Sequence, residues 1–231
     1  MGPRRLGARR RVSGTAGRLG ILGGTFDPVH LGHLALAEEV RETLDLARVL
    51  FVPAGDPWQK SGAGVTPGAV RCALLERAIA DNPGFAVSRI EIERPGPTYT
   101  AETLAGIAGA ERGAGRDPDL WFILSVEALA GLPTWRDPEQ VLALARLAVV
   151  PRAGDAEDLV AAAARFAERF PGLRDRALFL PGPRLAISST LIRARVAAGR
   201  SIRYLVPDAV ATAIREYALY QPTAAHAAPG P

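Results

Sequence analysis

The sequence reads Gly23-Gly24-Thr25-Phe26-Asp27-Pro28-Val29-His30-Leu31-Gly32-His33 where a short apolar segment gives way to a helical pattern. An apolar strand, a glycine turn and a helix start place backbone N–H groups where they can bind a phosphate. His30 and His33 share one face of the first helical turn, so both imidazoles can donate hydrogen bonds to the same anion. We therefore expect an anion-binding site here, rather than a glycine turn with incidental histidines.

This stretch resembles the G-x-F-x-P-x-H-x-G-H segment of the HIGH-motif nucleotidyltransferase superfamily. The fixed positions are filled by Gly24, Phe26, Pro28, His30, Gly32 and His33. The resemblance implies that His30 and His33 contact the phosphates of a nucleoside triphosphate and stabilise the transition state at the α-phosphorus. It also assigns to the ATP site Gly23, Gly24, Thr25, Phe26 and Gly32. Such a role suits an in-line displacement, in which positioned donors and cations supply most of the catalysis.

A second anion-binding segment lies near the other end of the chain and reads Ile187-Ser188-Ser189-Thr190-Leu191-Ile192-Arg193. Hydroxyl residues before a helical run cap the helix, and Arg193 one turn in can add a charge-assisted hydrogen bond. Taken alone, the segment also fits a plain capped helix. It resembles the I-S-S-T-x-x-R segment that binds the triphosphate tail in the same superfamily. The resemblance assigns Ser188, Ser189 and Thr190 to ATP binding and Arg193 to catalysis.

The central segments resemble one family, the bacterial nicotinate-nucleotide adenylyltransferases. Residues 52–57 with Lys60 match its V-P-A-G-x-P…K loop, and residues 94–104 match its R-x-G-P-S/T-Y-T-x-x-T-L segment. The resemblance runs from about Leu19 to Tyr220. It implies a pyridine-nucleotide pocket whose residues are Lys60, Thr98, Tyr99, Glu127 and Trp135. Trp135 could stack on the pyridine ring or pack under a loop, and Lys60 could contact phosphate or be solvated.

The chain departs from the family pattern at two places. Ser125-Val126-Glu127 replaces Gly-x-Asp after the fourth predicted strand, which adds a side chain where the backbone could need to approach a ligand. Trp58-Gln59 replaces Pro-His before Lys60. These changes affect one wall of the pocket and remove a possible third histidine of the site.

The resemblance implies an enzyme that joins the AMP of ATP to nicotinate mononucleotide, giving deamido-NAD and pyrophosphate. Mg²⁺ would arrive on ATP without a protein metal cage. We expect these two small molecules as the only partners, with no nucleic acid and no membrane, in a cytoplasmic protein whose oligomeric state stays open. Three alternatives remain: a phosphopantetheine- or glycerol-phosphate-type nucleotidyltransferase, a nucleotide-binding protein with weak or lost turnover, and nucleic-acid binding through an arginine arm.

The chain alternates short apolar runs with helical patterns, which predicts a single-domain α/β fold with a Rossmann-like, doubly wound parallel sheet. The expected strands are 19–22, 49–52, 85–87 (continuing as far as Ile92), 120–124, 147–150 and 178–180. The expected helices are 34–44, 69–80, 101–107, 138–145, 159–170, 189–197 and 208–217. The first phosphate-binding segment follows the first strand and then lies beyond its carboxyl end, where ligands bind in such sheets.

Composition sets the remaining boundaries. The net charge of +4 over 231 residues comes from six arginines within residues 1–18, so we expect a basic, disordered extension and not a basic face of the fold. Residues 221–231, which include the third histidine His226, form an Ala/Pro-rich tail that we also expect to be disordered. No apolar run reaches membrane-spanning length. The single cysteine, Cys72, precludes an internal disulfide and falls in a helical pattern that predicts burial.

Overall fold

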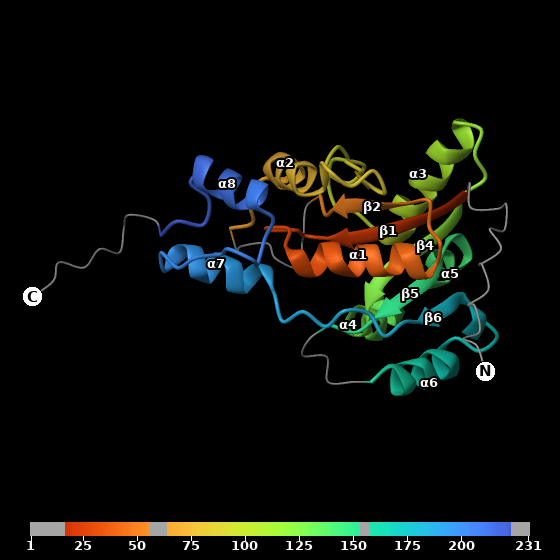
Figure 1. Ribbon diagram of the computed structural model, residues 1–231. Helices are drawn as coiled ribbons and strands as arrows, with labels where there is room; N and C mark the ends of the chain where they lie inside the picture. Colours follow the sequence, from red (N-terminus) through yellow and green to blue (C-terminus); the bar gives the residue numbers. More distant parts are fainter. Residues whose placement is uncertain (1–16, 56–63, 153–157, 223–231) are drawn as a thin grey trace, which may run out of the picture.

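The computed structural model describes residues 17–55, 64–152 and 158–222 (Figure 1). The strands are β1 (Arg18–Gly24), β2 (Arg48–Pro53), β3 (Phe85–Val87), β4 (Asp119–Ser125), β5 (Arg146–Val150) and β6 (Ala177–Phe179). The α-helices are α1 (Leu31–Thr43), α2 (Gly68–Ile79), α3 (Thr100–Gly113), α4 (Val126–Gly131), α5 (Pro138–Leu144), α6 (Leu159–Arg169), α7 (Ser189–Ala197) and α8 (Asp208–Glu216). Two 3-10 turns, η3 (Leu132–Thr134) and η4 (Arg174–Arg176), complete the set.

The strands form one parallel sheet with the order β3-β2-β1-β4-β5-β6. The chain builds outward from β1 in one direction and from β4 in the other, so the strand order reverses between these two central strands. This is the predicted doubly wound α/β fold. A crevice opens at such a reversal beyond the carboxyl ends of the strands, and the residues after β1 and β4 lie there.

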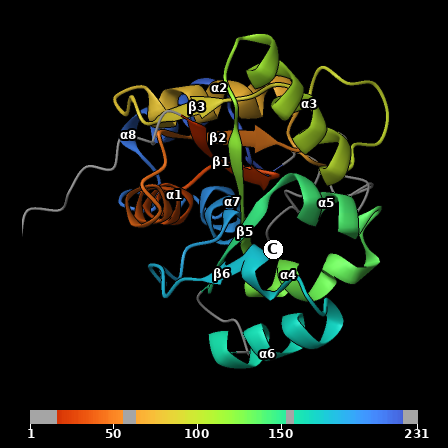
Figure 2. The same cartoon turned by 90° about the vertical axis from the view of Figure 1, so that its right-hand side faces the viewer.

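Helices cover both faces of the sheet (Figure 2), and each face carries its own apolar core. Because side chains alternate along a strand, Phe51 and Ile123 pack on one face and Leu50 and Phe122 on the other. Helices α1, α2 and α8 cover the first face, and α3, α4, α5 and α6 cover the second. With both faces covered, the strands read as continuous apolar runs, as the sequence indicated.

The third strand ends at Val87, so its predicted continuation to Ile92 was wrong. Ile90 and Ile92 have the alternation of a strand, but they pack on helices. The Ile90 Cδ1 lies 2.7 Å from the position that a Cβ of Gly106 would take, and the Ile92 Cδ1 lies 2.5 Å from that of Gly68. The side chains therefore fill notches in α3 and α2, which draws this segment away from the sheet.

The boundaries at the two ends differ slightly from the expected ones. β1 begins at Arg18, whose guanidinium donates to the Leu44 carbonyl at 3.0 Å, so this arginine belongs to the sheet and not to the extension. Residues 1–16 and 223–231, with His226, lie outside the described residues. Cys72 is fully buried, as predicted. In the described part of the chain, no helix is long and apolar enough to cross a membrane.

Candidate active site

The turn between β1 and α1 is shaped by a glycine and an aromatic ring. A Cβ on Gly24 would lie 3.0–3.3 Å from atoms of the Phe26 ring, so the ring packs closely on the bare backbone of this glycine. Phe26 itself has a φ of +49°, in the left-handed region, and the following Asp27–Pro28 peptide bond is cis. His30 is the N-cap residue of α1.

His30 and His33 form a stacked pair at the start of α1. Their ring centroids are 3.6 Å apart with an interplanar angle of 21°, and the Phe26 ring packs edge-on against His33 at 4.9 Å. The His30 backbone N–H donates to His33 Nδ1 at 3.3 Å. A Cβ on Gly32 would lie 3.0 Å from His30 Nδ1, so glycine at this position leaves room for the ring. The two imidazoles thus stack on each other, with Phe26 packed against His33 and Gly32 against His30.

Both imidazoles are neutral at neutral pH. Burial, followed by the positive charge of Arg152, lowers the pKa of His30 to about 4. Burial, His30 and Arg152 together lower the pKa of His33 well below its ordinary value. Since His33 Nδ1 accepts a hydrogen bond, its ring proton is on Nε2, and that N–H is available to an anion. Arg152 follows β5, and its charge acts on both rings.

The start of α7 is fastened to the turn after β1, across more than 160 residues of sequence. Ser189 Oγ donates to the Pro28 carbonyl at 2.8 Å, and an Arg193 N–H donates to the Asp27 carbonyl at 2.7 Å. The Leu31 N–H, the first of α1, donates to the Leu205 carbonyl at 3.0 Å. In Figure 1, α7 accordingly lies beyond the carboxyl end of β1. The two predicted phosphate-binding helix starts therefore lie side by side.

The hydroxyl groups at the start of α7 are not equivalent as phosphate donors. Ser189 directs its only hydroxyl proton to Pro28 and cannot also donate it to a phosphate while that bond exists. Ser188 Oγ accepts from the Leu191 N–H at 3.1 Å, and Thr190 Oγ1 accepts from Arg193 at 3.4 Å. Both of these hydroxyls keep their own proton. Of the three predicted phosphate-binding hydroxyls, Ser189 therefore holds α7 to the turn, and those of Ser188 and Thr190 can donate to a phosphate.

A buried arginine that the sequence reading missed lies beneath the turn. Arg71 of α2 is 1% exposed and donates to the carbonyls of Thr25 at 2.7 Å, Ala54 at 2.7 Å, Gly55 at 3.3 Å and Thr66 at 2.9 Å. These carbonyls belong to two loops: Thr25 to the turn after β1, and the other three to the two ends of the loop between β2 and α2. One guanidinium, with its five donors, therefore fixes the position of the turn relative to both ends of that loop.

Asp27 joins this support to the C-terminal segment of the fold. Its carboxylate is buried and accepts from the Thr66 N–H at 3.2 Å and from the Tyr220 hydroxyl at 2.6 Å. Burial and the Asp27 carboxylate raise the pKa of Tyr220, so its hydroxyl stays protonated and keeps donating. Tyr220, which follows α8, thus helps to hold the turn that precedes the histidines.

On the other side of the crevice, Glu91 organises the predicted pyridine loop. Its carboxylate accepts from Thr98 Oγ1 at 2.9 Å and from the buried Thr103 Oγ1 at 2.8 Å. A Cβ on Gly55 would lie 3.2 Å from the Thr98 methyl group, so this loop and the loop after β2 are in contact. The Thr98 hydroxyl is used to position the loop that carries Tyr99, the residue directly before the first turn of α3.

Aromatic residues connect this loop to the end of β1. The exposed Gly23 faces Phe122, whose ring atoms lie 3.7 Å from the position of a Gly23 Cβ. Phe122 contacts Trp135 edge-on at 6.0 Å. The next residue, Arg136, places its guanidinium carbon 4.5 Å from the centroid of the Tyr99 ring. Trp135 and Tyr99, which the resemblance placed in one pocket, are therefore linked through Arg136.

The Ser125–Glu127 departure starts a short helix. Ser125 Oγ accepts from the Ala128 N–H at 3.1 Å and caps α4, which the sequence reading did not predict. Ser125 is buried and Glu127 is exposed in the first turn of the helix. The serine side chain thus has a structural role at the end of β4.

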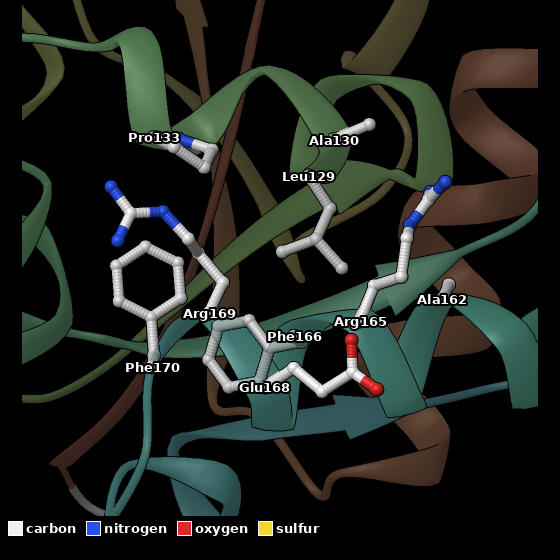
Figure 3. A pocket seen from close by; sticks show the side chains of 9 residues that line it. All are labelled: Leu129, Ala130, Pro133, Ala162, Arg165, Phe166, Glu168, Arg169 and Phe170. Atoms are coloured by element: carbon white, nitrogen blue, oxygen red, sulfur yellow. The ribbon is translucent and has the colours of Figure 1, made fainter.

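A cavity of about 390 Å³ lies between α4, η3 and α6 (Figure 3). Its lining consists of Leu129, Ala130, Pro133, Ala162, Arg165, Phe166, Glu168, Arg169 and Phe170. None of the predicted site residues belongs to this set. The cavity is therefore separate from the stacked histidines after β1 and from the start of α7.

Comparison with known proteins agrees with this geometry. A sequence model of the cytidylyltransferase-like family matches residues 21–195. The probable nicotinate-nucleotide adenylyltransferase of Roseiflexus sp. (strain RS-1) is 51% identical over 205 residues, covering 88% of this chain and 98% of that protein. The one of Thermomicrobium roseum is 45% identical over 204 residues, covering 88% and 92%. The chain belongs to the nicotinate-nucleotide adenylyltransferase family.

Solved structures of the same class share the fold. The nicotinic acid mononucleotide adenylyltransferase of Plasmodium falciparum, complexed with NaAD, superposes with a TM-score of 0.70 at 16% identity, covering 88% of this chain and 97% of that one. The same protein complexed with APC gives a TM-score of 0.69. The family assignment and the doubly wound fold predicted from the sequence are both confirmed.

Within this family member, the described residues bring together most of the predicted site. The two histidines, the glycine turn, the α7 hydroxyls and Arg193 lie on one side, and Thr98, Tyr99 and Trp135 lie on the other. Lys60 is outside the described residues. Among the described residues there is no group of three or more His, Cys, Asp or Glu side chains that could hold a metal ion. The supporting residues that sequence reading missed are Arg71, Glu91, Tyr220 and the carboxylate of Asp27.

Proposed function

We propose that this enzyme transfers the adenylyl group of ATP to nicotinate mononucleotide, giving deamido-NAD and pyrophosphate. The observation that carries the proposal is the stacked pair of His30 and His33 at the start of α1, fastened by Ser189 and Arg193 to the start of α7. Two helix N-termini then face one triphosphate, and the macrodipole of each favours negative charge there. The relatives whose names state this reaction cover nearly the whole described chain.

In the proposed reaction, a 5′-phosphate oxygen of nicotinate mononucleotide attacks the α-phosphorus of ATP in line. The new P–O bond forms as the bond to the β-phosphate bridging oxygen breaks, and pyrophosphate leaves with that electron pair. The attacking phosphate is already an anion, so no protein base is needed. Catalysis then depends on alignment and on stabilising the charge that builds on the phosphoryl oxygens.

The protein side chains would divide this work. His33 would donate from Nε2, and His30 would donate beside it, to oxygens of the α-phosphate. The hydroxyls of Ser188 and Thr190, the remaining donors of Arg193 and the charge of Arg152 would hold the departing β- and γ-phosphates. Because both imidazoles are neutral and already fixed by stacking, they would need little reorganisation as charge develops.

ATP would enter as its magnesium complex, with the ion bound mainly by phosphates and water. In this proposal the metal is part of the substrate. Thr25, Phe26 and the three glycines of the turn would form the adjoining backbone wall, and Thr98, Tyr99, Glu127 and Trp135 would receive the pyridine nucleotide.

The test is pyrophosphate release by the purified protein from MgATP in the presence of nicotinate mononucleotide. Nicotinamide mononucleotide and phosphopantetheine serve as alternative acceptors in parallel reactions. We expect release with a pyridine mononucleotide and none with phosphopantetheine. No release with either pyridine nucleotide would refute the proposal, and release with phosphopantetheine alone would favour the related nucleotidyltransferase.

A further inference from the structure

We propose that Arg136 binds the carboxylate of the nicotinate ring and sets the preference of the enzyme for the acid over the amide. The inference rests on the proposed function and adds a residue to it. The carboxylate and the carboxamide have nearly the same shape, so discrimination requires a group that responds to charge. A guanidinium is such a group, and it matches a carboxylate with two parallel N–H donors.

The position of Arg136 follows from a continuous series of contacts. The Phe122 ring lies beside Gly23 and contacts the Trp135 ring edge-on. Arg136 is the residue after Trp135 in the sequence. Its guanidinium then lies over the Tyr99 ring at 4.5 Å. A pyridine ring that occupies the space beside Trp135 and Tyr99, with its phosphate directed toward the turn after β1, would have its 3-substituent near this cation.

The guanidinium N–H groups of Arg136 donate no hydrogen bond to the described residues. Its nearest carboxylate oxygens are those of Glu102 at 3.8 Å and Asp137 at 3.9 Å, both beyond hydrogen-bonding distance, and 56% of its side chain is exposed. Other arginines around the crevice are committed. Arg71 donates to four carbonyls and Arg193 to the Asp27 carbonyl. Within the described residues of this loop region, Arg136 makes no hydrogen bond and can offer a planar pair of donors to a ligand.

The ring contact prepares the guanidinium for this role. Stacking on Tyr99 restricts a long side chain before the substrate arrives, which reduces the ordering cost of binding. A carboxamide would bring its own NH₂ group toward the N–H donors of Arg136 and would lack the charge. The amide substrate therefore gains little from this residue, and the acid gains a charge-assisted pair of hydrogen bonds.

The experiment compares kcat/KM for nicotinate mononucleotide and nicotinamide mononucleotide in the wild-type enzyme and in Arg136→Gln, Arg136→Lys and Arg112→Gln. Arg136→Gln should lower kcat/KM for the acid roughly 10- to 100-fold and that for the amide less than about threefold. The loss should lie mainly in KM, because the contact is remote from the reacting phosphorus. Arg136→Lys keeps the charge and should restore part of the preference.

Arg112→Gln is the matched control, because it removes one positive charge from the exposed far end of α3. It should leave the acid-to-amide ratio unchanged. If the ratio in Arg136→Gln stays within about twofold of the wild-type value, the inference is overturned, and backbone donors or other residues recognise the carboxylate. That outcome differs from failure of the proposed function, in which the wild-type enzyme itself releases no pyrophosphate with either nucleotide.

Discussion

The two halves of the site are built in opposite ways. The phosphate half, made of residues 23–33 and the start of α7, is held by side-chain hydrogen bonds to the turn. Ser189 donates to the Pro28 carbonyl, Arg193 to the Asp27 carbonyl, Tyr220 to the Asp27 carboxylate, and the His30 backbone N–H to the His33 ring. The pyridine half, made of Thr98, Tyr99, Trp135 and Arg136, is half-buried to exposed, and the Arg136 guanidinium lies over the Tyr99 ring without a hydrogen bond to the described residues. The phosphate half, where the proposed chemistry occurs, is therefore preorganised. The pyridine half, which would select the acceptor, can adapt to its ligand.

The largest expected effect comes from removing a histidine of the phosphate half. His30→Ala should lower kcat for pyrophosphate release by roughly 10²–10³ or more, on the scale of losing one preorganised transition-state donor. His226→Ala, the same substitution in the tail, is the control and should not change kcat. A His30→Ala enzyme with near-normal turnover would show that the stacked pair has no part in the reaction.

Removing the support beneath the turn should have the next largest effect. Arg71→Lys replaces the guanidinium by one ammonium that cannot reach all four carbonyls of the two loops, so several buried acceptors lose their partner. We expect a loss of about 2–4 kcal/mol in the free energy of unfolding, with a fall in kcat, measured by urea denaturation and by turnover. Arg77→Lys on the same helix retains an exposed ion pair with Glu216 and should change little. Equal stability of the two variants would contradict the assigned support.

The neutral histidines make stability depend on pH in a defined direction. The pKa of His30 in the folded protein, about 4, lies below its ordinary value of 6.5. As the pH falls through this interval the unfolded chain takes up the proton first, so the free energy of unfolding should decrease by up to about 1.4 kcal/mol per pH unit for this residue. The stabilisation is fully present above pH 6.5. Urea denaturation between pH 7 and pH 5 should give a gentler slope for His30→Gln, and an unchanged slope would contradict the assignment.

The smallest effect is expected at the clamp between α7 and the turn. Ser189→Ala removes one hydrogen bond and should cost about 1 kcal/mol of stability, with a several-fold higher KM for ATP. Ser201→Ala, which removes an exposed hydroxyl bound only to a nearby backbone N–H, is the control. If Ser189→Ala instead lowers kcat as strongly as His30→Ala does, Ser189 contacts the triphosphate directly and the division of the three hydroxyls is wrong.

Local pattern was sufficient to predict the sheet. The central strands β1, β2, β4 and β5 are apolar runs with buried side chains in both cores, so the pattern and the tertiary packing agree. The failure at Ile90 and Ile92 has the opposite cause. Their alternation is that of a strand, but the notches at Gly68 and Gly106 receive their side chains, and two helices must be placed before those notches exist. Helix α4, with six residues, is too short to show a helical period.

The site was predictable where residues that act together are close in sequence. His30 and His33 lie within one turn, and so do Ser188, Thr190 and Arg193. Glu91 and Tyr220 carry no local signal, because their partners are brought to them only by the fold. Arg71, in contrast, carries a local signal. It lies four residues before Leu75 on the buried face of α2, where a charged side chain needs tertiary contacts to satisfy it.

The hydrogen bond between Tyr220 and Asp27 joins nearly the last described residue to a turn near the start of the chain. During synthesis the glycine turn and both histidines leave the ribosome early, whereas Ser189, Arg193, Leu205 and Tyr220 follow about 160 to 190 residues later. A nascent chain that ends before Ser189 therefore lacks the hydrogen bonds that hold the turn after β1 to α7. We expect such a chain to bind ATP more weakly than the full chain does.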